Sequence, residues 1–202
     1  ERAYAPWPDM EGMLRRHGLP LATLESGTPL REFDLVGFSL QYELSFTNVL
    51  AMLEMGGIPL RRRDRREGHP VVIAGGPCCF NPAPMSAFID AFVIGEGEEV
   101  TGEIAAAMMR QKERGAGRDE MLAALAELTG VYVPAVHTQG EKIRKRVVAD
   151  LNAFMCPVRP LAPLMKTIHD RAVLEIARGC TRGCRFCQAG MVWRPVRERN
   201  PG

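Results

Sequence analysis

Three cysteines near the end of the sequence limit what this chain can fold around more than any other feature. Cys180, Cys184 and Cys187 follow the spacing C-x3-C-x2-C, with Gly179 directly before the first, Gly183 directly before the second and a short apolar run upstream. Zinc sites and two-cluster ferredoxins use four protein ligands, and the ferredoxin run is C-x2-C-x2-C-x3-C-P. Here the wide gap comes first and no fourth cysteine follows. The spacing indicates a 4Fe-4S cluster held by three thiolates, with one iron open to a small molecule.

Simpler interpretations of the same cysteines stay open. They could form a zinc knuckle completed by Cys156 or a histidine, or they could be reduced thiols with a structural role. The wide-then-narrow spacing, the glycines and the aromatic Phe186 just before the third cysteine favour the cluster. An electron-transfer cluster would need a fourth ligand, which this stretch does not supply.

At these residues the sequence resembles the radical S-adenosylmethionine (SAM) superfamily. The resemblance implies that Cys180, Cys184 and Cys187 bind three irons, that the methionine group of SAM chelates the fourth, and that Phe186 lies beside the adenine. It implies an enzyme in which the reduced cluster cleaves SAM to a 5′-deoxyadenosyl radical, which abstracts hydrogen from a substrate. The cofactor carries that chemistry, and the protein supplies ligands and orientation. An electron donor such as a flavodoxin or a ferredoxin is also implied.

The rest of the sequence predicts an α/β fold with an open, doubly wound, mostly parallel sheet, because short apolar runs alternate with helical patterns. We expect a hairpin of residues 131–133 and 142–148, and we expect Asp119 to cap a helix. The other predicted elements are strands at 35–40, 71–74 and 91–94, and helices at 42–55, 85–89, 98–114 and 119–128.

We expect three parts along the chain: an α/β domain (residues 1–150), a linker (151–170) and the start of a radical SAM domain with the cluster loop (171–202). A barrel of β/α units needs on the order of 200 residues. Only fifteen residues follow Cys187. The chain is therefore expected to be a fragment that supplies the first β/α unit of the barrel and is inactive by itself.

Glycine turns at two predicted strand ends carry a second hypothesis. Ligands of open parallel sheets bind outside the carboxyl ends of the strands, where glycine allows close approach to backbone amides. The paired turns resemble the cobalamin-binding-like domain that precedes the barrel in one radical SAM subgroup, and this resemblance implies a corrin pocket. Its candidate cofactor-binding residues are Ser39, Gly75, Gly76, Pro77, Gly95, Glu96 and Gly97.

The cobalamin hypothesis meets a departure from the pattern. Cobalamin domains with a histidine ligand carry D-x-H-x-x-G, and this motif is absent here. The glycines could instead only make tight turns. An alternative function is therefore a non-catalytic corrinoid- or nucleotide-binding module whose cysteines are structural or bind zinc. Metal content would separate the two functions, since the enzyme requires iron and sulfide.

Charge and hydrophobicity narrow the possible partners. A net charge of +2 argues against a dedicated nucleic-acid binder, and no stretch approaches the ~20 apolar residues of a membrane span. The arginine run at 61–66 is predicted to be a solvated loop. Seven arginines between 171 and 199 favour a role beside the cluster and SAM, although RNA contact is the alternative. The substrate, RNA or a small molecule, is not specified.

Cysteine usage predicts the compartment. Cys78 and Cys79 are adjacent, so in an extended chain their side chains point to opposite sides and cannot easily share one metal. We expect these two to pack as small, soft side chains. With three other cysteines clustered like ligands, the sequence does not indicate a disulfide framework. A reducing, cytoplasmic compartment is expected.

Overall fold

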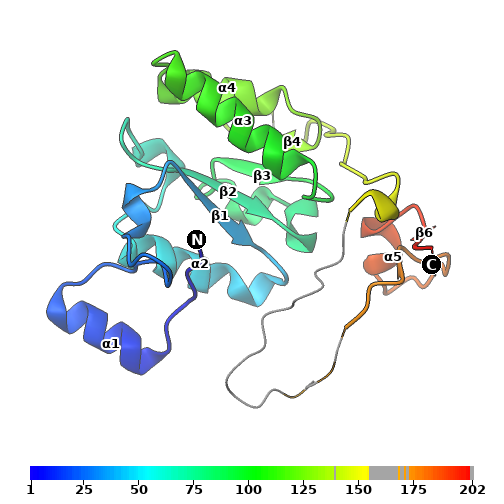
Figure 1. Ribbon diagram of the computed structural model, residues 1–202, viewed down its shortest axis with the longest axis horizontal. Coiled ribbons are helices and arrows are strands. Elements are labelled where there is room, and N and C mark those ends of the chain that lie inside the picture. The colour runs from blue at the N-terminus through cyan, green and yellow to red at the C-terminus, as the bar shows by residue number, and fades with distance from the viewer. Residues whose placement is uncertain (139, 155–167, 169–170, 172, 201–202) are drawn as a thin grey trace. The chain divides into compact units, whose positions relative to one another are not determined.

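The structure is a computed structural model that describes residues 1–138, 140–154, 168, 171 and 173–200 (Figure 1). It divides into two compact units, Glu1–Arg146 and Val147–Gly202. Most of the predicted linker, with Cys156, lies outside the described residues. None of the described helices has the length and apolar composition needed to cross a bilayer.

Unit 1 is built on a four-stranded sheet in the order β1-β2-β3-β4. Strands β1 (Leu35–Ser39), β2 (Val71–Gly75) and β3 (Ala91–Val93) are parallel, whereas β4 (Val131–Tyr132) is antiparallel to β3. The prediction of an α/β fold with a mostly parallel sheet is confirmed.

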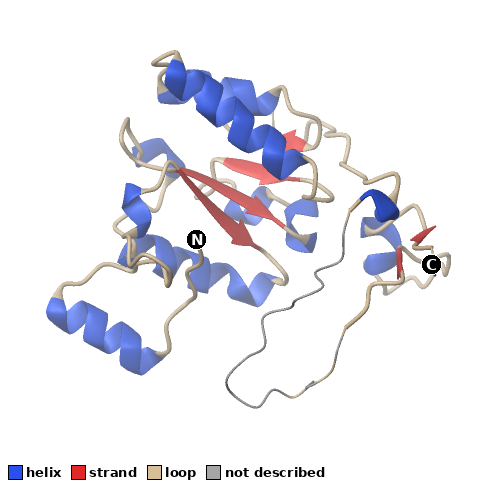
Figure 2. Cartoon of the chain, in the orientation of Figure 1, coloured by secondary structure: helices blue, strands red, loops and turns tan. Residues whose placement is uncertain are grey.

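Helices cover both faces of this sheet (Figure 1, Figure 2). Helix α2 (Phe46–Met55) packs on one face, and α3 (Val100–Glu113) and α4 (Arg118–Ala126) pack on the other. The strands are apolar on both sides because both faces are covered. Within β2, Val72 joins the core beneath α2, and its neighbour Val71 joins the core beneath α3 and α4.

Helix α1 (Pro8–His17) was not predicted, and it buries none of its residues. Its boundaries follow ordinary rules, with proline at the first helical position and Gly18 in the left-handed conformation at the C-cap (φ 62°). The predicted helix at 85–89 is instead a 3₁₀ turn at Ala83–Met85. The other 3₁₀ helices are Leu30–Glu32, Glu43–Ser45, Arg62–Asp64, Pro77–Phe80 and Leu151–Ala153.

Two local predictions about α4 and β4 are wrong. Helix α4 is capped at Gly117, whose amide donates to the Glu120 carboxylate at 3.0 Å, so Asp119 lies inside the first turn. The predicted hairpin is absent from the described residues: β4 pairs with β3, and residues 142–148 form no strand. That pairing buries Val131 almost completely. The charged second segment instead makes an isolated parallel bridge between Gly95 and Arg146.

Unit 2 contains three short elements around the cysteines. Strand β5 (Ala177–Arg178) precedes them, helix α5 (Ala189–Val192) follows them, and β6 (Arg197–Glu198) pairs antiparallel with β5. Along the chain the order is strand, loop, helix and a returning antiparallel strand. Assignment of this unit to a barrel stays a prediction.

A buried carboxylate joins the separate segments of unit 1. Asp90, directly before β3, accepts hydrogen bonds from Arg65 at 2.8 Å, from Arg118 at 2.7 Å and from the amide of Val72 at 2.8 Å. The Arg65 side chain is fully enclosed, and burial lowers the pKa of its guanidinium. Three charges therefore lie together away from water, at the junction of β2, β3 and α4.

We predict that Asp90→Ala lowers the free energy of unfolding by about 3–5 kcal/mol, because it leaves two buried guanidinium groups without their shared carboxylate. Urea denaturation of both proteins measures this change. The matched control is Asp34→Ala, which removes an exposed ion pair with Lys112 and should cost less than about 1 kcal/mol. Equal losses in the free energy of unfolding from the two substitutions would show that the ion pairs of Asp90 with Arg65 and Arg118 do not organise the fold.

Candidate functional site

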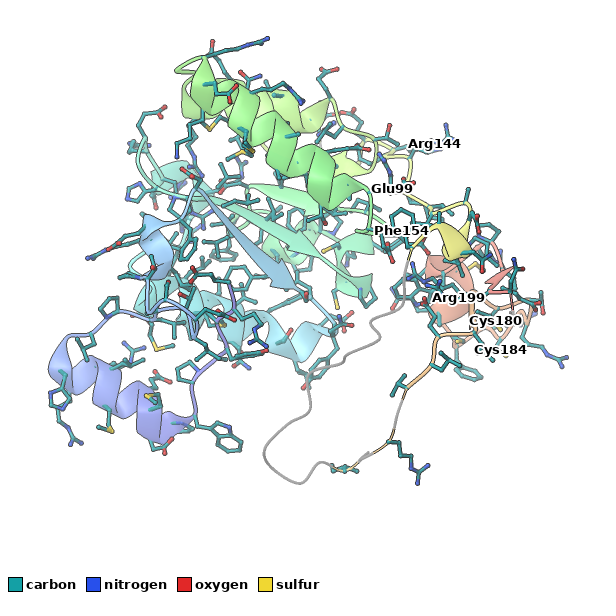
Figure 3. All side chains as sticks on the ribbon, in the orientation of Figure 1. Glu99, Arg144, Phe154, Cys180, Cys184 and Arg199 are labelled. Carbon is teal, nitrogen blue, oxygen red and sulfur yellow. The ribbon has the colours of Figure 1, made fainter. Side chains whose placement is uncertain are left out.

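The three predicted ligands lie on one loop of unit 2, between β5 and α5. Cys180 and Cys187 are half-buried and Cys184 is exposed, all as free thiols (Figure 3). The loop folds back on itself through the amide of Arg182, which donates to Cys180 Sγ at 3.4 Å, and the amide of Cys187, which donates to the Cys184 carbonyl at 3.1 Å. The three thiols therefore lie on one short segment that is partly open to solvent.

Gly179 sets the start of this loop. Its φ is 92°, and a Cβ added there would lie 2.7 Å from the Trp193 carbonyl oxygen and 2.8 Å from that of Pro195. Only glycine permits both the conformation and the close approach. The returning chain therefore packs directly on the residue before Cys180.

The donor set fits an iron–sulfur cluster by its chemistry. Three free thiols on one loop, partly open to solvent, are the ligands that such clusters take. Zinc requires its ligands converged on one ion at about 2.0–2.3 Å. Within the described part of the chain, no three histidine, cysteine or acidic side chains are placed to hold a single metal ion. The described residues therefore form no ready-made metal site, and the role of the three cysteines as cluster ligands stays a prediction.

Phe186 exposes 93% of its surface. Its ring is free to contact a ligand bound beside Cys187. The predicted contact with the adenine of SAM stays a prediction.

The adjacent cysteines of unit 1 are not part of this site. Cys78 and Cys79 are buried in the 3₁₀ turn after β2 and belong to the core beneath α2. Burial raises the pKa of the Cys78 thiol, and it raises that of Cys79 to about 12. The prediction that these two residues pack as structural side chains is confirmed.

The predicted corrin-binding residues meet partly at the carboxyl edge of the sheet. Ser39 and Gly75 are register partners at the ends of β1 and β2. Ser39 also lines a cavity of about 450 Å³, together with Ser45 and Asn48 from the segment that begins α2. A Cβ on Gly75 would make only an ordinary contact, 4.0 Å from Val93.

Two of the glycines pack against the chain itself. Gly76 has a φ of 108°, and a Cβ there would lie 2.7 Å from the Leu40 carbonyl oxygen. Gly95 has a φ of 114°, and its Cβ would lie 2.7 Å from the Arg146 amide nitrogen and clash with the carbonyl oxygen. Tight packing of the backbone explains both residues without a ligand.

The remaining predicted residues lie around these two. Pro77 begins the 3₁₀ turn, and Gly97 is exposed. Glu96 is buried, and its amide donates to the Arg146 carbonyl at 3.2 Å. The structure thus places the second glycine turn under the Arg146 segment.

Sequence reasoning missed the role of Arg146. Its guanidinium pairs with Glu99 at 3.1 Å and also with Glu103, and the hydrogen bonds raise its pKa (Figure 3 labels Glu99). The two acids are four residues apart at the N-terminal end of α3, a spacing that the sequence displays. A second correction concerns Arg65, which is buried and not part of a solvated loop.

Comparison with known proteins identifies the family. Residues 1–134 match the family described as "Radical SAM proteins, N-terminal". The chain belongs to this family. It is also 28% identical over 182 residues to an uncharacterized protein of Methanocaldococcus jannaschii, an alignment that covers 87% of this chain and 34% of the relative. The chain thus spans about a third of the length of that relative. No solved structure matches.

We predict that an alkylating reagent at mildly alkaline pH modifies Cys184 of the metal-free radical SAM chain first and Cys79 only after denaturation. Alkylation requires thiolate, and the raised pKa of Cys79 leaves almost none. Mass spectrometry of peptides from timed samples measures the order. Early modification of Cys79 would contradict its burial in the core.

Proposed function

We propose that this chain is part of a radical SAM enzyme and that Cys180, Cys184 and Cys187 bind its 4Fe-4S cluster. Two separate parts of the sequence support the proposal. The family match covers residues 1–134, whereas the cysteines lie outside it, in unit 2. The observation that carries most weight is the presence of three free, accessible thiols on one loop that is fixed by Gly179.

Each part of unit 2 has a role in this proposal. The three thiolates hold three irons, and Phe186 packs against the adenine of SAM. When bound, the cluster supplies the electron that cleaves SAM to methionine and a 5′-deoxyadenosyl radical. The β5–β6 pair holds the ends of the cysteine loop, and the exposure of Cys184 leaves room for a ligand beside it.

The substrate, RNA or a small molecule, and the flavodoxin- or ferredoxin-like electron donor belong to the same proposal. The residues that select a substrate are proposed to lie in the part of the enzyme that corresponds to the rest of the longer relative. A reducing, cytoplasmic compartment suits thiols that must stay free for iron.

A ligand at the carboxyl edge of the sheet is a second proposal. It is supported by Ser39, the register partner of Gly75, which lines a cavity that extends along β1 to Leu35. Gly75 is not among the residues that line this cavity. The close packing of Gly76 and Gly95 against their own chain weakens the case for a corrin at the paired turns.

We predict that anaerobic reconstitution with iron and sulfide gives this chain a 4Fe-4S cluster, and that SAM changes the EPR spectrum of the reduced protein. The spectrum changes because SAM binds the open iron. Iron and sulfide analysis together with EPR, with and without SAM, measures both steps.

Replacing Cys180, Cys184 and Cys187 together by serine should abolish the cluster. The matched control is the double substitution of Cys78 and Cys79 by alanine, which removes two thiols from the buried core and should leave the cluster signal intact. Zinc in place of iron would instead support the binding-module alternative. A cluster that does not respond to SAM would support a true cluster site that lacks the rest of its barrel, and the longer protein would be tested next.

We predict that, if a corrinoid binds at the carboxyl edge, Gly75→Ala weakens its binding about tenfold, because the added methyl group narrows the approach to the backbone. Titration of hydroxocobalamin followed by absorbance compares this variant with the wild type. The fold should tolerate the change, given the 4.0 Å contact. Absence of binding by the wild type would remove the corrin proposal and leave the cluster proposal untouched.

A further inference from the structure

A carboxylate at the base of the cysteine loop links the two ends of that loop. Glu175 accepts hydrogen bonds from Arg178 Nε at 2.6 Å and Nη2 at 3.1 Å. The same carboxylate accepts from Arg199 Nη2 at 2.9 Å. Arg178 is the last residue of β5, two positions before Cys180, and Arg199 directly follows β6. One side chain therefore bridges the chain that enters the loop and the chain that returns from it.

The network extends beyond this carboxylate. Arg199 Nη1 donates to the Phe154 carbonyl at 2.8 Å and also to that of Leu151 (Figure 3 labels Arg199 and Phe154). The amide of Arg199 donates to the Ile176 carbonyl at 2.9 Å. The 3₁₀ turn at the start of unit 2 is thus tied to the same arginine.

Strand pairing alone is a weak support for the loop. Strands β5 and β6 pair over two residues each, and an isolated two-stranded pair is marginally stable in water. Additional contacts must fix the relative position of the two strands. The bond from Arg199 to Glu175 does so, because it joins the end of β6 to the chain that enters β5. The bidentate bond from Arg178 holds the Glu175 carboxylate in place on the β5 side, since two parallel N–H···O bonds fix orientation as well as distance.

The charged side chains of this network are partly buried, so their hydrogen bonds compete less with water than those of an exposed ion pair. The side chains of Arg178 and Arg199 are 17% and 15% exposed, and that of Glu175 is 33% exposed. Arg199 Nε is buried and has no hydrogen-bond partner in the described part of the chain. Loss of the carboxylate would leave this buried cation with even fewer partners.

We infer that Glu175 is a positioning residue for the three cysteines. Through Arg178 it fixes the backbone that leads into Cys180, and through Arg199 it fixes that backbone against the returning strand. The inference rests on the proposed function for the role of the thiols as cluster ligands. The geometric role of Glu175 in the metal-free loop does not depend on it.

The test compares the 202-residue chain with its E175Q variant, which keeps the size of the side chain and removes its charge. After reconstitution with iron and sulfide, E175Q should lose iron to a chelator about tenfold faster, the size of effect typical of residues that orient metal ligands. In the metal-free proteins, hydrogen–deuterium exchange of residues 176–187 should also be faster in E175Q. E198Q, a charge-matched control on β6, should resemble the wild type in both measurements.

A double-mutant cycle separates the network from a general charge effect. R178Q should lose iron about as fast as E175Q, and the double variant E175Q/R178Q no faster than either, because residues in one network are not additive. R178K serves as a second, milder variant if E175Q does not fold. It retains the charge but lacks the planar fork of arginine, and it should give an intermediate rate of iron loss.

Wild-type rates of iron loss and exchange in E175Q would overturn the inference, as would equal effects of E175Q and E198Q. Failure of the wild type to bind iron would overturn the proposed function instead. In that case, the exchange measurement on the metal-free chain still decides whether Glu175 orders the loop.

Discussion

The architecture of unit 1 depends on one carboxylate shared between two buried arginines. Asp90 binds Arg65 and Arg118 and also accepts from the amide of Val72 in β2. Strands β2 and β3 share only two register pairs, so the backbone alone fixes their relation weakly. Burying these charges carries a large desolvation cost, which replacement by apolar residues would avoid. We infer that the buried Asp90, Arg65 and Arg118 side chains favour this one arrangement of the chain over others. They can meet only when β3, the arginine run and α4 are all in place.

The fixed positions of β2 and β3 determine how much space is left for a ligand at the carboxyl edge of the sheet. With β2 and β3 fixed, Gly76 packs on Leu40, and the turn after β3 is covered by the segment that carries Arg146. Positive φ angles at Gly76 and Gly95 therefore serve the packing of the chain on itself. A cavity that Ser39 lines lies beside β1. A glycine at a strand end can serve either a bound ligand or the close approach of another backbone segment. At Gly76 and Gly95, the neighbouring contacts favour the close approach of backbone.

Much of the fold could be predicted from the sequence because its strands are apolar on both sides and are bounded by glycine. The cysteine spacing likewise indicated the loop that the structure displays. Errors arose where a distant partner decides the conformation. The segment at 142–148 was expected to be one strand of a hairpin, but its Arg146 pairs with Glu99 and Glu103 at the N-terminal end of α3. Arg65 looked solvated among its neighbours, since only the fold brings Asp90 to it. The local sequence pattern cannot show which arginine of a run will form an ion pair with a residue far away in the sequence.

Both units use the same arrangement, an acid shared by two arginines from separate segments, but burial gives it different consequences. Asp90 is 1% exposed, so its removal would leave two buried charges unpaired and threaten the whole unit. The Glu175 side chain is 33% exposed, so water can replace part of what it supplies. Loss of Glu175 should therefore cost little global stability and act mainly on the geometry of the adjacent loop. This difference is what makes the first carboxylate a determinant of the fold and the second a candidate determinant of function.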